Sequence, residues 1–495
     1  GLLTGTVGFA VGGTLTASSG ITGAVTTATN NTGTLNVAGG VTGAIASPGL
    51  ALKVVQLNSG TYTLGSTANA TNFTVNSATA TVTATGLLTG AVDFTASGTL
   101  TAGGGITGNV NFAGKSGTLN LAAGQLITGN VDNTGATANR GTLVFLGNTS
   151  SATGTIGATN PLAMVSFNGA GAINVPNNAR SAVFNVGNAA ANVTAGQLIT
   201  GNVKYTAAGT FNANAGINGA VITTTSNTGR LTLVGTVTGG IGGVGLFLQA
   251  VEFNAGASRL IGAAYVQNCT VKSAAATVQI GQFFGNINFD AAGTITMYGI
   301  TGNIDFKNNA GLLSLTGTGI SGNVDSTSGS NGTLQFTGTS NALVVGTIGP
   351  TNPLAEVKFS GTTPVAIPTA RANQFTIENA GANVKASGLL TGNVVYNTSG
   401  IVSANAGITG NANFAGNSGT LNLAAGKTIT GTVDNTGTTA NKGTLNITGG
   451  TVTGAVGSTN PLNTVTFNAG TSSLGSTARA SNFTVNSATA AVTAT

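Results

Sequence analysis

Apolar and polar residues alternate along this chain in short stretches that small residues separate. In segment 105–112, GITGNVNF, every second position is apolar except for one glycine. This period of two predicts a β-strand with one buried face. GTLNL at 117–121 continues the alternation and predicts a second strand. Gly, Asn, Ser and Ala between the stretches favour tight bends, and no period of 3.6 residues indicates a helix.

One motif recurs from end to end: an aliphatic residue, any residue, Gly, any residue, then Val, Ile or Ala. Its spacing is mostly 17 to 25 residues, with four long steps of 46 or 47. A fixed period in this range is typical of repeat architectures. We interpret a long step as two short ones with an altered middle motif. The central glycines are Gly5, Gly23, Gly43, Gly90, Gly108, Gly129, Gly154, Gly201, Gly219, Gly239, Gly285, Gly302, Gly322, Gly346, Gly392, Gly410, Gly431 and Gly454.

A second signature, TNPL followed by V-x-F, falls inside long steps. It occurs at 159–162, 351–354 and 459–462. The repeat is therefore hierarchical, and coils of about 20 residues group into five cycles. Segments 106–143 and 408–445 match at 31 of 38 positions, which indicates duplication. The predicted cycles are 1–85, 86–196, 197–280, 281–387 and 388–495.

Short strands at a fixed period cannot bury their apolar faces alone and must stack on their neighbours. The predicted fold is therefore all-β, a single continuous parallel β-solenoid over 1–495, with right-handed coiling expected for parallel crossovers. About 23 coils at roughly 4.8 Å each give a rod on the order of 110 Å. Cys269, which stands where sister cycles have Phe, is expected in the core. Broken aromatic columns are expected from Phe9, Phe94, Phe112, Tyr205, Phe289, Phe306, Tyr396 and Phe414.

The last segment of the chain predicts how the chain begins. Segment 474–495 matches 64–85 at 19 of 22 positions. GLLTGAVDF follows Thr85, and the chain itself starts with GLLTGTVGF, without an initiator Met or a signal peptide. We expect either an excised register of a longer tandem array or identical subunits that join end to end.

Composition narrows the function class. Hydrophobic residues make up 41% of the 495 residues and charged residues only 5%, which argues against disorder. The 80 Gly follow no period of three and Pro is scarce, so a collagen helix is excluded. The net charge of +6 comes from scattered Lys and Arg, so no nucleic-acid partner is predicted. No segment is long and apolar enough for a membrane helix, and a single Cys allows no internal disulfide.

Candidate chemistry is limited to carboxylates, because the chain has no His and one Cys. Five of the nine carboxylates share the position three residues after a motif glycine, where other coils carry Asn. Stacking would form one ladder of Asp93, Asn111 and Asp132 and another of Asn288, Asp305 and Asp325. The carboxylates are Asp93, Asp132, Glu252, Asp290, Asp305, Asp325, Glu356, Glu378 and Asp434.

Two interpretations of this row are open: a calcium or carbohydrate-hydrolysing row, and an outward structural ladder. We favour the structural ladder, because no Arg or Lys recurs beside the carboxylates and calcium-binding glycine–aspartate nonapeptides are absent. We therefore predict no catalytic, cofactor-binding or metal-binding residue. A neighbouring row, whose amides are expected to hydrogen-bond along the stack, comprises Asn109, Asn130, Asn202, Asn286, Asn303, Asn323, Asn393 and Asn411.

The coils ITGNVNFAG at 106–114, GTLNLAAG at 117–124 and ITGNVDNTG at 127–135 resemble a known family. They are similar to passenger regions of the large autotransporter surface antigens of rickettsiae, including the outer membrane protein B that coats the cell as a surface layer. The resemblance implies an exported, cell-surface β-solenoid with structural or adhesive work. It supplies no catalytic residue for these motifs.

The leading hypothesis is an extracellular structural protein, not an enzyme, that forms a surface layer, sheath or filament by stacking its open ends on itself. The alternative is an adhesin passenger that binds a host or neighbouring cell surface through the insertions of its long steps. A third hypothesis is a β-helix enzyme acting on polysaccharide.

Overall fold

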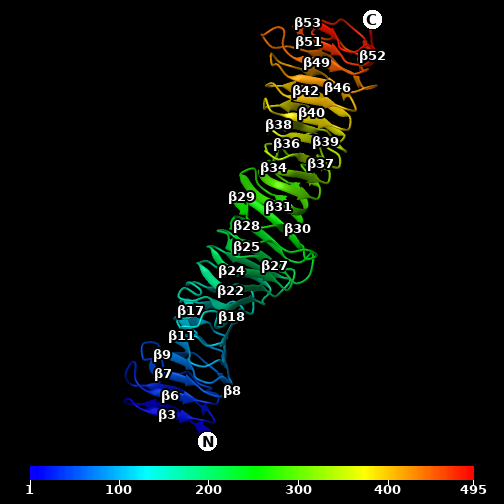
Figure 1. The fold of residues 1–495 in the computed structure, drawn as a ribbon. Helices are drawn as coiled ribbons and strands as arrows, with labels where there is room; N and C mark the ends of the chain where they lie inside the picture. The colour runs from blue at the N-terminus through cyan, green and yellow to red at the C-terminus, as the bar shows by residue number, and fades with distance from the viewer. The chain divides into compact units, whose positions relative to one another are not determined.

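The computed structural model describes residues 1–495, and every regular element in it is a β-strand (Figure 1). The strands of successive coils pair in parallel, which confirms the predicted β-solenoid. A turn takes roughly 19 residues, and there are about 26 turns rather than 23. No helix is present that could cross a membrane. The chain divides into two compact units, Gly1–Val251 and Glu252–Thr495.

One turn of unit 1 illustrates the architecture. It runs through β12 (Thr99–Ala102), β13 (Ile106–Thr107) and β14 (Val110–Asn111), and β15 (Thr118–Leu121) then begins the next turn on top of β12. Each turn thus contributes to three ladders, and its apolar side chains point between them into the core. The three ladders pair Leu100 with Leu119, Ile106 with Ile127, and Val110 with Val131.

The motif glycine forms a corner between two of these ladders. We predicted one strand over 105–112, but the chain bends at Gly108, whose φ is +149°, and so splits into β13 and β14. A Cβ at Gly108 would overlap the carbonyl oxygen of Gly90 in the preceding coil. Only glycine fits such a corner. Motif glycines therefore stack in columns, including 90–108–129–154 in unit 1, and 285–302–322–346 and 392–410–431–454 in unit 2.

The long steps are more than two coils, which corrects our interpretation of them. The ladder from Ile45 through Ala68 to Leu88 covers two turns. Gly43 lies two residues before that ladder and Gly90 two residues after it. A long step is thus two turns plus four residues, and it moves the motif glycine to the next corner of the solenoid. The ladder Ile348, Ala370 and Leu390 repeats this shift in unit 2.

The core is a stack of aliphatic rungs with short aromatic columns. Phe94 stacks on Phe112 with ring centroids 4.7 Å apart. The same pairing occurs between Phe289 and Phe306 at 4.7 Å and between Tyr396 and Phe414 at 4.8 Å, so the predicted broken columns are confirmed. Cys269 is fully buried in register with Ile287, and burial raises the pKa of its thiol. It is a core residue, as predicted.

Three successive coils of unit 2 lack one of the corners present in unit 1. β10 (Ala80–Ala84) and β11 (Leu88–Phe94) of unit 1 are separated by a bend. In unit 2 the corresponding strands merge into one continuous strand, β31 (Ala276–Phe289). The next two coils do the same in β32 (Thr294–Thr301) and β34 (Leu312–Ser321). This side of unit 2 is therefore a wider sheet.

Candidate functional site

The asparagine row forms hydrogen bonds along the stack, as predicted, but with the backbone rather than with other amides. Asn109 Oδ1 accepts a hydrogen bond from the backbone N–H of Asn130 at 2.9 Å. Asn130 Oδ1 accepts one in turn from Thr155 N at 2.9 Å. Each amide thereby satisfies a backbone donor that the glycine corner leaves unpaired. The same contact is made by Asn202, Asn286, Asn303, Asn323, Asn393 and Asn411.

The carboxylates of the predicted ladders do lie in register. Asp93 pairs with Asn111 and Asn111 with Asp132. In unit 2, Asn288, Asp305 and Asp325 follow one another in the same way.

The last carboxylate of a ladder binds the TNP segment of the following turn. Asp132 accepts hydrogen bonds from the backbone N–H of Thr159 at 3.0 Å and from its hydroxyl at 2.6 Å. The side chain of Asn160 donates to the carbonyl oxygens of Asn133 and Gly135 at 3.2 and 2.9 Å. We name this arrangement the Asp–TNP clamp. It recurs between Asp325 and Thr351–Asn352 and between Asp434 and Thr459–Asn460.

The clamp changes the expected position of these carboxylates. We predicted an outward structural ladder, but Asp325 and Asp434 are only 8% exposed, because the TNP segment covers them. Burial raises the pKa of Asp434, yet hydrogen bonds from Thr459, Ser458 and Asn435 outweigh it and hold that pKa below its usual value. These carboxylates act as hydrogen-bond acceptors for a turn. The TNPL insertions, which the adhesin hypothesis treated as contacts, are docked on the preceding turn of the solenoid.

Other carboxylates are paired with lysines. Asp290 lies between Lys272, whose Nζ is 2.7 Å away, and Lys307. Hydrogen bonds from the two lysines lower the pKa of Asp290. Lys358 lies 3.4 Å from Glu356 and 3.1 Å from Glu378.

Glu378 is also held by a serine. Burial raises the pKa of Glu378, but hydrogen bonds from Ser360, at 2.6 Å, and from Lys358 more than compensate and lower it. No three carboxylate, Cys or His side chains come together as a group that could hold a metal ion.

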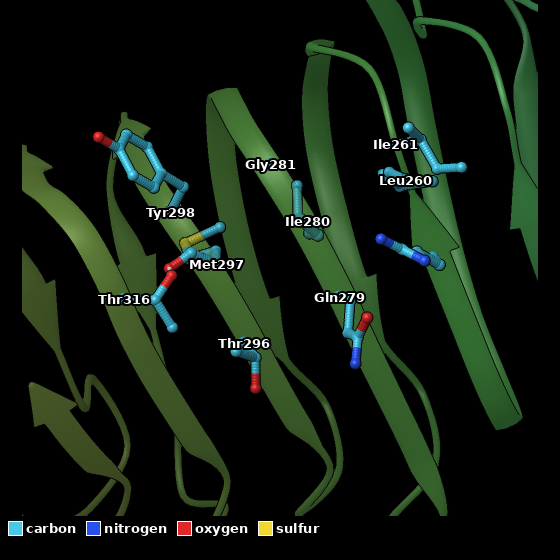
Figure 2. Close-up of a pocket in the computed structure, with 10 residues that line it drawn as sticks. Leu260, Ile261, Gln279, Ile280, Gly281, Thr296, Met297, Tyr298 and Thr316 are labelled. Atoms are coloured by element: carbon cyan, nitrogen blue, oxygen red, sulfur yellow. Dashed lines mark hydrogen bonds between the residues drawn. The ribbon is translucent and has the colours of Figure 1, made fainter. Parts of the chain in front are cut away.

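The widened sheet of unit 2 carries a groove of about 380 Å³ (Figure 2). The floor of the groove includes Gly281 of β31, and this glycine has no side chain to fill the space above it. Ile261 stands on one side of this gap and Tyr298, from β32, on the other, with exposed fractions of 50% and 45%. A Cβ at Gly281 would meet the carbonyl oxygens of Ile261 and Gly262, at 3.6 and 3.9 Å, which is ordinary van der Waals distance. We name this feature the Tyr298 groove.

Polar side chains line one margin of the Tyr298 groove. Arg259, at the end of β29 (Leu248–Leu260), is in register with Gln279, and Gln279 with Thr296. The side chains of these three residues make no hydrogen bond or ion pair within the chain. The Tyr298 hydroxyl is likewise unpaired. Thr316 closes the groove and donates its hydroxyl hydrogen to the carbonyl of Met297 at 3.1 Å.

The corresponding row of unit 1 behaves differently. There, Asn120 Nδ2 donates to Thr101 Oγ1 at 3.3 Å, and Asn212 Nδ2 to Asn192 Oδ1 at 2.8 Å. Those polar side chains therefore satisfy one another along the stack. The polar groups of the Tyr298 groove are available to a ligand.

Our sequence reasoning missed this groove, although a signal was present. Where the first cycle passes into the second, Val82 precedes Gly90 by eight positions, whereas Val278, where the third passes into the fourth, precedes Gly285 by only seven. One missing corner residue converts two strands into one. The next coils repeat the deletion, since Leu100 precedes Gly108 by eight positions and Ile295 precedes Gly302 by seven.

Comparison with known proteins shows a similarity to a bacterial outer membrane protein. The chain is 30% identical over 396 residues to the Outer membrane protein A of Rickettsia rickettsii, covering 70% of this chain and 15% of that protein. The chain thus spans only a small part of the relative it matches. No family model and no solved structure matches. The match supports the resemblance to rickettsial surface antigens as a kind of protein, while a closer likeness to outer membrane protein B stays a prediction.

Proposed function

We propose that this chain is a structural component of a bacterial cell surface, a β-solenoid that is lengthened by stacking of further coils into a layer, sheath or filament. The name and source of the relative support a cell-surface location, and the solenoid fold suits an extended scaffold. The proposal assigns no catalysis to the chain. Its polar rows serve to hold one coil on the next.

The observation that carries the proposal is the apolar face of the last coil. Phe483 and Val485 in β53 (Ala480–Val485) are 49% and 62% exposed. Their counterparts Phe73 and Val75 in β9 (Ala68–Val75) are fully buried, because β11 lies over them. β53 pairs only with β51 (Leu462–Phe467), so its other side has unpaired backbone donors and acceptors. The surface has the chemistry of an interface between coils.

The exposed apolar face of β53 is best covered by a coil like the one at the start of this sequence. β11 belongs to the segment GLLTGAVDF, and GLLTGTVGF occupies 1–9. Leu2 and Leu3 of that segment are 58% and 38% exposed. We therefore propose as partner the same type of coil, from a second copy of this chain or from a longer tandem array.

Assembly of the purified 495-residue chain tests this proposal. We expect concentration-dependent oligomers in sedimentation velocity and filaments by electron microscopy. Val485→Asp places a charge where the next coil must pack, so the variant is expected to stay monomeric. Val244→Asp is the matched control, since Val244 is 85% exposed in the turn Gly243–Leu246. A parent chain that stays monomeric, or a Val485→Asp variant that assembles like the control, overturns self-stacking.

An adhesin that presents this solenoid on the cell surface is the second candidate. The Tyr298 groove favours it, because unpaired polar groups and an exposed aromatic ring gather there. One result would distinguish this function from stacking: unit 2 binds a ligand, and Val485→Asp changes neither the binding nor the assembly state of the chain.

A further inference from the structure

We propose that the Tyr298 groove is a binding site for an acidic sugar, the carboxylated pyranose unit of a glycan. The proposal goes beyond the stacking role and does not depend on it. It rests on the shape of the groove, on its one charge and on the unpaired state of its polar groups (Figure 2).

The shape of the groove fits one sugar ring better than a protein. Its volume of about 380 Å³ lies near the lower end of the range for small-molecule sites, roughly 300–1,000 Å³. The gap over Gly281 lies between two raised side chains, Ile261 and Tyr298. These neighbours stand on strands two spacings apart, about 10 Å. A flat protein interface would need a far larger continuous surface.

The two walls suit the two faces of a pyranose. The negative face of the Tyr298 ring attracts the weakly positive C–H bonds on the apolar face of a sugar. Tyr298 is the most exposed of the five tyrosines, and Tyr62, Tyr205 and Tyr396 are buried. Its hydroxyl and that of Thr296 make no hydrogen bond within the chain and can exchange hydrogen bonds with sugar hydroxyls, and the Thr316 hydroxyl can accept one.

The charge of the groove indicates an acidic sugar. Arg259 is the one charged residue in the lining, and no carboxylate lines the groove. Four of the six arginines donate side-chain hydrogen bonds within the chain, whereas Arg259 and Arg230 do not. A planar guanidinium binds a carboxylate through two parallel hydrogen bonds. Gln279, beside Arg259, supplies a further amide donor.

Binding of defined sugars to the full chain tests the proposal, by calorimetry or by saturation-transfer NMR. The probes are trigalacturonate and 3′-sialyllactose, with the methyl ester of trigalacturonate and lactose as uncharged counterparts. We expect at least one acidic probe to bind about tenfold or more tightly than its uncharged counterpart. Which of the two binds identifies the source as a hexuronate or a sialic acid. Equal binding of charged and uncharged probes, or binding of neither acid, overturns the proposal.

Variants locate the site. Arg259→Gln is expected to weaken binding of the acidic probe about 10- to 100-fold, and Arg259→Lys less, because it keeps the charge but not the fork. Arg230→Gln removes an equally unpaired charge in unit 1 and is the matched control. If Arg230→Gln weakens binding as much as Arg259→Gln does, the acidic probe is attracted by the net positive charge of the chain, and the Tyr298 groove is not its binding site.

Two further variants test the shape. Tyr298→Ala removes the aromatic wall, and Leu343→Ala is its control, since Leu343 is 52% exposed outside the groove. Gly281→Val fills the gap at a position where a Cβ has room and φ is not positive. Both Tyr298→Ala and Gly281→Val are expected to lower binding at least tenfold while hydrogen exchange of β31 stays unchanged. Full binding by Gly281→Val would place the ligand elsewhere.

Discussion

The coils around Gly108 in unit 1 and around Gly302 in unit 2 have nearly the same core and different surfaces. In each, two aromatic rings stack at 4.7 Å, with interplanar angles of 24° and 22°. In unit 1 the outward polar side chains hydrogen-bond along the stack, and a bend separates the strands. In unit 2 one residue is missing at the bend, and the strands merge. Packing constrains the inside of the solenoid and its glycine corners, whereas a bend such as the one between β10 and β11 can lose a residue and so form a new surface.

The largest expected difference between the two regions concerns their glycines. Gly108→Val forces a side chain into the backbone of the preceding coil at φ +149°. We expect a local loss of about 3 kcal/mol or more, measured by hydrogen exchange of β13 and β14. Gly281→Val is expected to leave β31 protected, because its Cβ makes only ordinary van der Waals contacts, at 3.6 Å or more. Equal losses in the two variants would mean that the two glycines do not differ in role.

The Asp–TNP clamp is common to the two regions and is expected to behave alike in them. Asp132→Ala leaves the N–H of Thr159 without an acceptor, and Asp325→Ala does the same to Thr351. Each substitution is expected to cost about 1–2 kcal/mol of local stability. The exchange rates of these two amides are the measurement. Asp93→Ala is the control, since Asp93 accepts a hydrogen bond from Asn72 but holds no TNP segment.

A smaller difference is expected for the outward polar side chains. Asn109→Ala removes the acceptor for Asn130 N–H, at a cost of about 1 kcal/mol. Gln279→Ala removes no hydrogen bond within the chain and is expected to leave stability unchanged. Urea-dependent hydrogen exchange compares the two. A stability loss in Gln279→Ala would show that the margin of the Tyr298 groove is structural rather than free.

The smallest expected effect is a loss of local stability in acid, in unit 2 and not in unit 1. Asp290 of unit 2 lies between Lys272 and Lys307, which lower its pKa, whereas Thr95 follows β11 in unit 1. Since the pKa of Asp290 is lower in the folded state, its stabilisation is complete above the usual value of 3.8 and is lost as the pH falls further. In acid we expect the backbone amides just after β31 to lose protection against hydrogen exchange. The amides just after β11 are expected to show no such loss. Asp290→Asn is expected to abolish the response.

The repeating interior could be predicted from sequence, because each coil repeats the same physical problem. The alternation in GTLNL specifies a buried face, and the register of Asp93, Asn111 and Asp132 follows from the repeat alone. The corner at Gly108 escaped prediction, because glycine continues a period of two without showing that the chain turns. The cover over Asp325 and Asp434 depends on contacts between a carboxylate and a segment 26 or 25 residues later. The Tyr298 groove depends on one deleted residue, which a motif search tolerates.

In unit 1 the motif moves by one corner of the solenoid in each of the first two long steps, so its position turns about the long axis. The first three cycles place their glycine columns at successive corners, since Val25 and Leu88 share a ladder, as do Val110 and Ile199. The motif glycine and the polar row that follows it therefore move to the next corner of the solenoid from one cycle to the next. Duplication of a whole cycle would lengthen the core without disturbing its packing. It would also move the surface rows of the following cycles to the next corner of the solenoid. The number of cycles that a gene encodes thus sets the direction in which a surface row faces, as well as the length of the solenoid.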